Sequence, residues 1–360
     1  MTPVDQPNNP TPSHATIVLT VTADGEPASS IEQAAAILRA GGLVAFPTET
    51  VYGLGADATN PAAVERIFRA KGRPHSDPLI VHIAEPEDLP RVARDLPATA
   101  QALAARFWPG PLTLVVPRGA HIPALVAAGG DTVGVRVPAS QVARALIRAA
   151  GVPVAAPSAN RFMHTSPTAA AHVLADLDGR IDCVLDGGPS AVGVESTVLD
   201  LTESPPRVLR PGGVTLEALR AVLPDVEGPA PSPTTGGVAR APGQLERHYA
   251  PHTRLIVFDA QGSPALDAMR ATAKAAHQAG ERVGALLATG EAGALRDVLD
   301  VIEPLGEGIE DISRHLYAGL RTLDAAGVDV ILSHTFGTDG LALAVTDRLR
   351  RAAGGMLTAV

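Results

Sequence analysis

The sequence contains a single cysteine, Cys183, among 360 residues. One cysteine cannot form an internal disulfide, and this suits a reducing compartment. Cys183 stands in the apolar run IDCVLD, where a small core residue is a simpler interpretation than a reactive thiol. The same scarcity excludes a zinc site built on pairs of cysteines.

Long apolar runs are also absent. No stretch approaches the roughly 20 uninterrupted apolar residues that a membrane-spanning helix needs. The first residues, MTPVDQPNNPTPSH, have neither the basic start nor the apolar run of a signal peptide. We therefore expect a soluble, cytoplasmic protein with no membrane partner.

Aromatic side chains and positive charge are scarce as well. Aromatic residues make up 3% of the chain, and its formal net charge is −9. These values argue against a surface that holds long nucleic acids by base stacking and broad phosphate neutralisation. An anionic ligand must then be bound by a local cluster of cations, which suits a small molecule better than a long polyanion.

The length and the order of apolar runs predict two domains. Residues 15–224 contain more strand-like than helical runs, which predicts a mixed α/β sheet. Residues 252–360 alternate regularly between strands and helices, which predicts a smaller, parallel, Rossmann-like sheet. Between them, residues 225–251 begin with a Pro/Gly/Ser/Thr-rich stretch that is typical of a linker. Residues 1–14 are predicted to be a flexible tail.

Lysine is the rarest basic residue: of 29 lysines and arginines, only Lys71 and Lys274 are lysines. Lys71 follows a predicted helix over residues 60–70, whose Asn60 is a suitable N-cap and whose Pro61 suits the first turn. It is followed by Arg73 in the stretch KGRPHSDPLIVHI.

The cations around Lys71 allow two interpretations. Arg66, Arg69, Lys71 and Arg73 fall within eight residues of an acidic protein. A phosphate site needs such a concentration, with an ammonium as a mobile point charge and a guanidinium as a planar fork. A solvated helix end, where the helix dipole favours cations, is the simpler alternative.

Common nucleotide-binding signatures are absent. Neither lysine stands in a Gly-Lys-Ser/Thr loop, and YGLGADA lacks the third glycine of a dinucleotide fingerprint. Ser158 and Asn160, in PSAN, and the segment GVEST place small polar groups beside strand-like runs, where α/β sheets bind ligands. A simple turn explains each of them equally well. His82 alternates with apolar neighbours in IVHIA, a pattern more often seen for a packed core histidine than for a ligand.

Several motifs occur together in one order: PTETVYGLG, KGRP, PLIVHI, FWPGPLTLVV, VGVRVP, APSAN, VESTVLDL and RPGG. In these motifs the chain resembles the YrdC-like threonylcarbamoyl-AMP synthase family, in its long form with an additional C-terminal domain. The resemblance covers roughly residues 25–215, and APGQLERHYAP (241–251) resembles the family's linker motif. It implies a YrdC-like twisted mixed sheet with helices, followed by the smaller Rossmann-like domain.

The resemblance also implies a reaction, that of a nucleotidyltransferase. L-threonine, bicarbonate and ATP, accompanied by Mg²⁺, would give threonylcarbamoyl-AMP and pyrophosphate, with no tightly bound organic cofactor. The product would pass to a tRNA threonylcarbamoyl-transferase complex that modifies the adenosine beside the anticodon, and direct tRNA binding would be weak or absent. Because the reactants are anionic, such a site needs positioning and positive charge rather than a covalent nucleophile.

By the same resemblance, Lys71 and Arg73 are the catalytic pair. The L-threonine-binding positions are Thr50, His82, Arg136, Ala156 and Ser196. The ATP-binding positions are Arg73, Asp77, Thr132, Ser158, Asn160, Ser166, Arg210 and Tyr249. No residue is expected to form a protein metal site. Tyr249 lies in the linker, which would therefore act as a lid on the active site.

Two other functions are considered. An RNA-binding or ribosome-maturation module could use the same concave surface, but the charge of −9 and the scarce aromatics argue against it. A carbamoyltransferase of the hydrogenase-maturation type shares this kind of domain. Such proteins carry zinc-finger cysteines, which a chain with one cysteine cannot supply.

Overall fold

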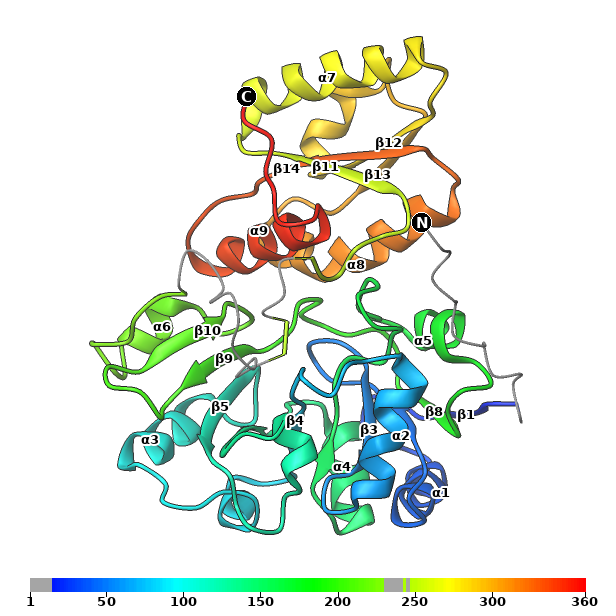
Figure 1. Cartoon of the computed structure of the whole chain (residues 1–360). Helices are drawn as coiled ribbons and strands as arrows, with labels where there is room; N and C mark the ends of the chain where they lie inside the picture. The colour runs from blue at the N-terminus through cyan, green and yellow to red at the C-terminus, as the bar shows by residue number, and fades with distance from the viewer. Residues whose placement is uncertain (1–14, 230–241, 244–246) are drawn as a thin grey trace, which may run out of the picture.

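The computed structural model describes residues 15–229, 242–243 and 247–360. The predicted tail, 1–14, and 15 of the 27 residues of the predicted linker lie outside these residues. The chain forms one ten-stranded sheet and one four-stranded sheet. Figure 1 shows the four-stranded part, coloured yellow to red, above the larger part, with helices α8 and α9 between the small sheet and the larger part.

The larger sheet is mixed. Its strands are β1 (Ile17–Thr20), β2 (Val44–Phe46), β3 (Gly53–Asp57), β4 (Ile80–His82), β5 (Leu112–Pro117), β6 (Thr132–Arg136), β7 (Val154–Ala155), β8 (Cys183–Asp186), β9 (Thr197–Asp200) and β10 (Arg207–Arg210). They are arranged in the order β1-β8-β2-β3-β7-β4-β6-β5-β9-β10. Parallel pairs such as β4 with β6 stand beside antiparallel pairs such as β5 with β6. The predicted mixed α/β sheet is confirmed.

Helices pack around this sheet. They are α1 (Ala28–Arg39), α2 (Pro61–Lys71), α3 (Ala98–Phe107), α4 (Gln141–Ala150), α5 (Ala170–Leu177) and α6 (Leu216–Arg220). The start of α2 is as predicted: the Asn60 side chain accepts hydrogen bonds from the backbone N–H groups of Ala62 and Ala63. The helix ends at Gly72, whose φ of 67° is in the left-handed region that glycine adopts readily. Cys183 is buried in the core, as expected.

Strand β3 was not predicted, because the glycine-rich YGLGADA does not look like a strand. Its glycines are required by close packing. A Cβ atom on Gly55 would lie 2.8 Å from the ring of Phe46 and 2.8 Å from the side chain of Val154. Strand β3 pairs with β2 and β7. Because Gly55 has no side chain, Phe46 of β2 and Val154 of β7 can pack directly against its backbone.

The smaller sheet is parallel throughout, as predicted. Its strands are β11 (Arg254–Phe258), β12 (Val283–Leu287), β13 (Val301–Pro304) and β14 (Val330–His334), in the order β11-β14-β12-β13. Its helices are α7 (Gly262–Gln278), α8 (Ile309–Ala325) and α9 (Gly340–Ala352). Helix α7 covers one face, and α8 and α9 cover the face toward the larger sheet (Figure 1). The prediction missed β13, a half-exposed edge strand without a long apolar run.

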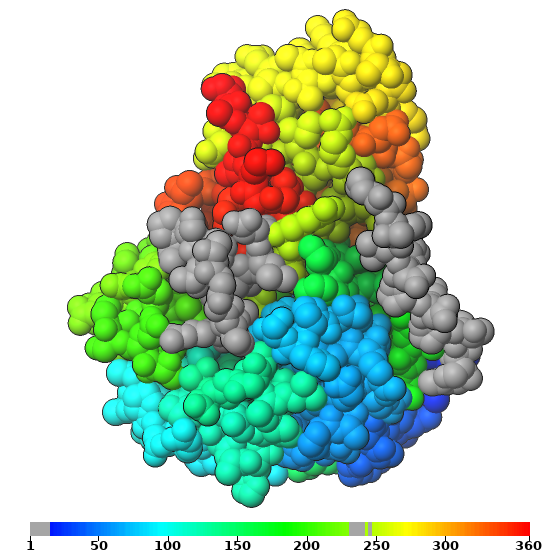
Figure 2. Space-filling view, viewed as in Figure 1, coloured from blue at the N-terminus to red at the C-terminus, as the bar shows by residue number. Residues whose placement is uncertain are grey.

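The two parts share a packed interface. Val51 and Val194 of the larger part belong to the same hydrophobic cluster as Leu316 of α8. The Ser313 hydroxyl of α8 donates a hydrogen bond to the Val192 carbonyl at 2.7 Å. Figure 2 shows the yellow-to-red part seated directly on the blue-to-green part. The C-terminal domain is therefore well placed to influence any site near residues 192–196.

In the described part of the chain, no helix has the length and apolar character needed to cross a membrane.

Candidate active site

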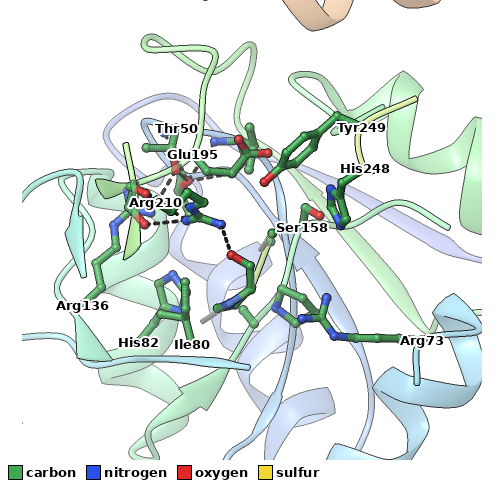
Figure 3. A pocket seen from close by; sticks show the side chains of 18 residues that line it. Thr50, Arg73, Ile80, His82, Arg136, Ser158, Glu195, Arg210, His248 and Tyr249 are labelled. Carbon is green, nitrogen blue, oxygen red and sulfur yellow. Dashed lines mark hydrogen bonds between the residues drawn. The ribbon is translucent and has the colours of Figure 1, made fainter. Parts of the chain in front are cut away.

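A pocket lies where several strands of the larger sheet end. Its space, counted out to the open mouth and including solvent there, is about 510 Å³. Figure 3 shows its walls. It is lined by Thr48, Thr50, Val51, Gly53, Arg73, Ile80, His82, Arg136, Ala156, Pro157, Ser158, Glu195, Ser196, Arg210, Pro242, Gly243, His248 and Tyr249.

One end of the pocket is built on neighbouring parallel strands. His82 and Arg136 are register partners at the ends of β4 and β6, so their side chains leave the same face of the sheet. The Arg136 guanidinium donates to the Thr50 hydroxyl at 2.9 Å and to the Gly110 carbonyl at 3.1 Å, and it pairs with Glu49 at 2.6 Å. These bonds hold a planar fork against the pocket, which suits a bidentate carboxylate.

The other end holds two more arginines. Arg210, at the end of β10, donates to the Ser196 carbonyl at 2.9 Å and to the Pro242 carbonyl at 3.1 Å. Arg73 donates to the Pro78 carbonyl at 2.7 Å and pairs with Asp77 at 3.0 Å. Ser158 lies between these two side chains (Figure 3). Two fixed guanidinium groups beside a hydroxyl are a suitable arrangement for phosphate oxygens.

The structure separates the four cations of the predicted cluster. Arg66 pairs with Asp182 at 2.7 Å, and Arg69 is exposed. The Lys71 ammonium points into the protein and donates to the carbonyls of Ser158, at 2.6 Å, and Asn160. Only Arg73 lines the pocket. Lys71 therefore acts on the PSAN loop, since its hydrogen bonds fix that backbone.

Four other predicted positions lie outside the pocket lining. Asp77 faces Arg73, and the Asn160 amide donates to the carbonyls of Arg161 and His164. The Ser166 hydroxyl donates to Glu195 at 2.6 Å.

Thr132 also lies outside the pocket lining. It begins β6, opposite Pro117, whereas Arg136 ends the strand. Four residues of strand place these two about 13 Å apart. The remaining predicted positions line the pocket, among them Ala156, Ser196 and Tyr249.

The sequence reasoning did not single out Glu195 or His248. Both are buried and line the pocket. Glu195 stands in the motif VESTVLDL, but a carboxylate is not expected to line an anion site, and its charged partner Arg348 comes from a distant segment. His248 did carry a signal, because it precedes Tyr249 in the linker motif.

The buried charges perturb the ionisable groups around the pocket. Burial, followed by the charge of Arg73, holds the pKa of Lys71 well below its ordinary value. Burial, followed by the charges of Arg73 and Lys71, lowers the pKa of His248 well below its ordinary value. Burial and then the charge of Arg136 lower the pKa of His82 to about 3. These histidines are neutral at neutral pH, so the pocket's positive charge comes from its arginines.

Acidification should destabilise the larger domain. The unfolded chain protonates His82 near pH 6.5 whereas the folded protein does not until about pH 3, so stability is lost as the pH falls through that window. Between pH 7 and pH 5 this one group should cost about 2 kcal/mol. Denaturation followed by the fluorescence of Trp108, the only tryptophan, measures it.

The variant His82→Gln should lose stability less steeply on acidification, and His121→Gln, at an exposed position, is the matched control. An equal pH dependence in the wild type and His82→Gln would contradict the assignment.

Comparison with known proteins identifies the family. A family model described as "Telomere recombination" matches residues 36–212, and one described as "Threonylcarbamoyl-AMP synthase, C-terminal domain" matches residues 214–354. The threonylcarbamoyl-AMP synthase of Pyrococcus abyssi is 46% identical over 325 residues, which cover 90% of this chain and 94% of that protein. The chain belongs to the threonylcarbamoyl-AMP synthase family. It is therefore an enzyme of transferase type, as the resemblance of its motifs implied.

Two further comparisons support this membership. The threonylcarbamoyl-AMP synthase of Bacillus subtilis is 43% identical over 328 residues, which cover 90% of this chain and 93% of that protein. The crystal structure of Pyrococcus abyssi Sua5 complexed with L-threonine matches with a TM-score of 0.90 and 44% identity, and covers 96% of this chain and 100% of that one. The chain therefore has both domains of the long form of the threonylcarbamoyl-AMP synthase family.

Proposed function

We propose that this enzyme condenses L-threonine, bicarbonate and ATP to threonylcarbamoyl-AMP, pyrophosphate and water. The observation that carries the proposal is the convergence of Arg73, Arg136 and Arg210 on one pocket. A carboxylate and a triphosphate bound side by side need such fixed cations. The threonine complex of the Pyrococcus abyssi relative supports the assignment of one end to the amino acid.

The proposed chemistry is positioning of anionic reactants. The threonine amine condenses with bicarbonate, with loss of water, to form a carbamate; by the alternative route, bicarbonate first loses the water and the amine adds to the resulting carbon dioxide and gives up a proton. A carbamate oxygen then attacks the α-phosphorus, and the bond from that phosphorus to the bridging β-oxygen breaks to release pyrophosphate. Arg136 and Thr50 would hold the threonine carboxylate, with His82, Ala156 and Ser196 around it. Fixed dipoles and charges lower the barrier without a covalent nucleophile.

The nucleotide would occupy the end formed by Arg73, Ser158 and Arg210. Tyr249 covers this end as the proposed lid, and its buried hydroxyl has no hydrogen-bond partner among the described residues. Lys71 and Asn160 would hold the loop that carries Ser158. We propose that the catalytic domain ends at residue 224 and that the C-terminal domain begins at residue 252. The linker between them, residues 225–251, would form part of the active site.

Mg²⁺ would enter with ATP. Glu195 is the only carboxylate among the described residues that line the pocket, and it already accepts hydrogen bonds from Ser166 and Tyr317 and pairs with Arg348. The pocket residues therefore do not form a protein-based Mg²⁺ site. The ion would be held by the phosphates and by water, as is usual for Mg²⁺.

The product is a reactive mixed anhydride, which an acceptor must consume before water hydrolyses it. We propose a cytoplasmic tRNA threonylcarbamoyl-transferase complex that modifies the adenosine beside the anticodon. The net charge of −9 supports transfer to a partner rather than tight tRNA binding by this chain.

The test is incubation of the full chain with ATP, Mg²⁺, bicarbonate and L-threonine, with mass spectrometry for threonylcarbamoyl-AMP. The expected product depends on both threonine and bicarbonate, shown by omitting each in turn. A folded protein that binds ATP and makes no such product would refute the proposal. Tight RNA binding without ATP turnover would instead support the RNA-binding alternative.

A further inference from the structure

Arg348, on helix α9 of the C-terminal domain, is the largest fully buried side chain of the described chain. Burying a guanidinium is costly unless each nitrogen has a partner. Its Nε pairs with Glu195 at 2.7 Å, one terminal nitrogen donates to Asp347 at 2.6 Å, and the other donates to the Pro211 carbonyl at 2.9 Å. Each guanidinium nitrogen therefore has a partner, and two of these three partners belong to the other domain.

Arg348 contacts the pocket wall or residues next to it. Glu195 and Tyr249 line the pocket, and Pro211 directly follows Arg210, which also lines it. The Arg348 guanidinium carbon lies 5.1 Å from the centre of the Tyr249 ring, within cation–π range. One side chain of the second domain therefore contacts Glu195, Tyr249 and the residue after Arg210, which belong to three separate segments of the chain.

Glu195 presents an electrostatic problem for an anion site. Burial would raise its pKa, but the charges of Arg348 and Arg210 outweigh that effect and lower the pKa below its ordinary value. The ionised carboxylate accepts from the Tyr317 hydroxyl at 2.9 Å and from the Ser166 hydroxyl at 2.6 Å. Without Arg348, this carboxylate would be left with Arg210 as its nearest compensating charge, and Arg210 would be withdrawn from the phosphates.

We propose that Arg348 is a positioning residue for the nucleotide end of the pocket: it neutralises Glu195 and fixes the Tyr249 wall, so that Arg210 stays available for phosphate. This inference rests on the proposed function, because it takes the ligand at that end to be ATP. It also assigns a task to the C-terminal domain, which completes an active site otherwise built by the larger domain.

The experiment compares Arg348→Met with Arg350→Met in the full-length protein. Arg350 lies on the same helix, and its only described ion pair is with Asp347 at 3.5 Å, so it is the matched control. Binding of α,β-methylene-ATP is measured by calorimetry, and steady-state kinetics are measured for ATP and for threonine separately. Arg348→Met should weaken nucleotide binding and raise KM for ATP by about 30-fold or more. KM for threonine should change far less, and the control should match the wild type.

A second substitution separates electrostatics from loss of structure. The double variant Arg348→Met with Glu195→Gln should recover most of the nucleotide affinity, because the uncompensated carboxylate is gone. If Arg348→Met fails to fold, Tyr317→Phe replaces it. That variant removes one hydrogen bond to Glu195 with little change in packing, and KM for ATP should rise about 10-fold.

The outcomes are distinct. Wild-type nucleotide affinity in Arg348→Met or, if that variant does not fold, in Tyr317→Phe would overturn the positioning role. A double variant as weak as Arg348→Met would overturn it too. Failure of the wild type to make threonylcarbamoyl-AMP would count against the proposed function instead, and binding of α,β-methylene-ATP would still decide the role of Arg348.

Discussion

Replacing Lys71 with alanine should reduce the rate of threonylcarbamoyl-AMP synthesis by about 100-fold or more. The Lys71 ammonium donates to the backbone carbonyls of Ser158, at 2.6 Å, and Asn160. Alanine leaves both carbonyls without this partner in a buried site, and each loss costs about 1–3 kcal/mol. The loop that carries Ser158 should then relax, and a shift of about 1 Å in an active site can cost a factor of about 100.

The sequence supplies a matched control for this substitution. Lys274, the only other lysine, lies exposed on α7. The variant Lys274→Ala should keep the wild-type rate, measured as threonylcarbamoyl-AMP formed per enzyme. Circular dichroism should show that both variants are folded. Wild-type turnover in a folded Lys71→Ala variant would remove Lys71 from the catalytic machinery.

The variant Arg136→Gln should lower kcat/KM for threonine by about 30-fold or more and leave nucleotide binding nearly intact. Arg136 is buried, and its guanidinium is aimed by Thr50, at 2.9 Å, and by Glu49, at 2.6 Å. A carboxylate bound by two parallel N–H groups loses both when the fork is removed. The measurement is the initial rate as a function of threonine at saturating ATP, together with binding of α,β-methylene-ATP.

Two further variants show whether the lower kcat/KM for threonine comes from loss of the Arg136 guanidinium. Arg144 pairs with Glu85 at 2.5 Å, and neither residue lines the active-site pocket. The variant Arg144→Gln therefore removes an arginine–glutamate pair that is more exposed and lies outside the pocket, and it should keep the wild-type KM for threonine. The double variant Arg136→Gln with Glu49→Gln tests whether an unpaired Glu49 repels the substrate. Full recovery in the double variant would mean that repulsion by Glu49, and not loss of the Arg136 fork, causes the defect.

The sequence alone determined the local elements and the family. The Asn60 cap, the bounds of β5 at Leu112–Pro117 and the parallel C-terminal sheet followed from residue patterns that act over a few positions. The family motifs also identified nine of the eighteen residues that line the pocket. Among these, His82, Arg136 and Arg210 each end a strand. Short-range capping, alternation and turn chemistry are encoded in adjacent residues, so they can be read without a structure.

Tertiary structure decided which of these residues face the ligand. It turned Lys71 inward onto two carbonyls and left Arg73 alone of its cluster in the pocket. It joined Glu195 to Arg348 across 153 positions of the chain. The direction of a side chain and the partner of a buried charge depend on long-range packing. A charge needs a partner only when packing of the two domains buries it, because an unpaired buried charge is costly.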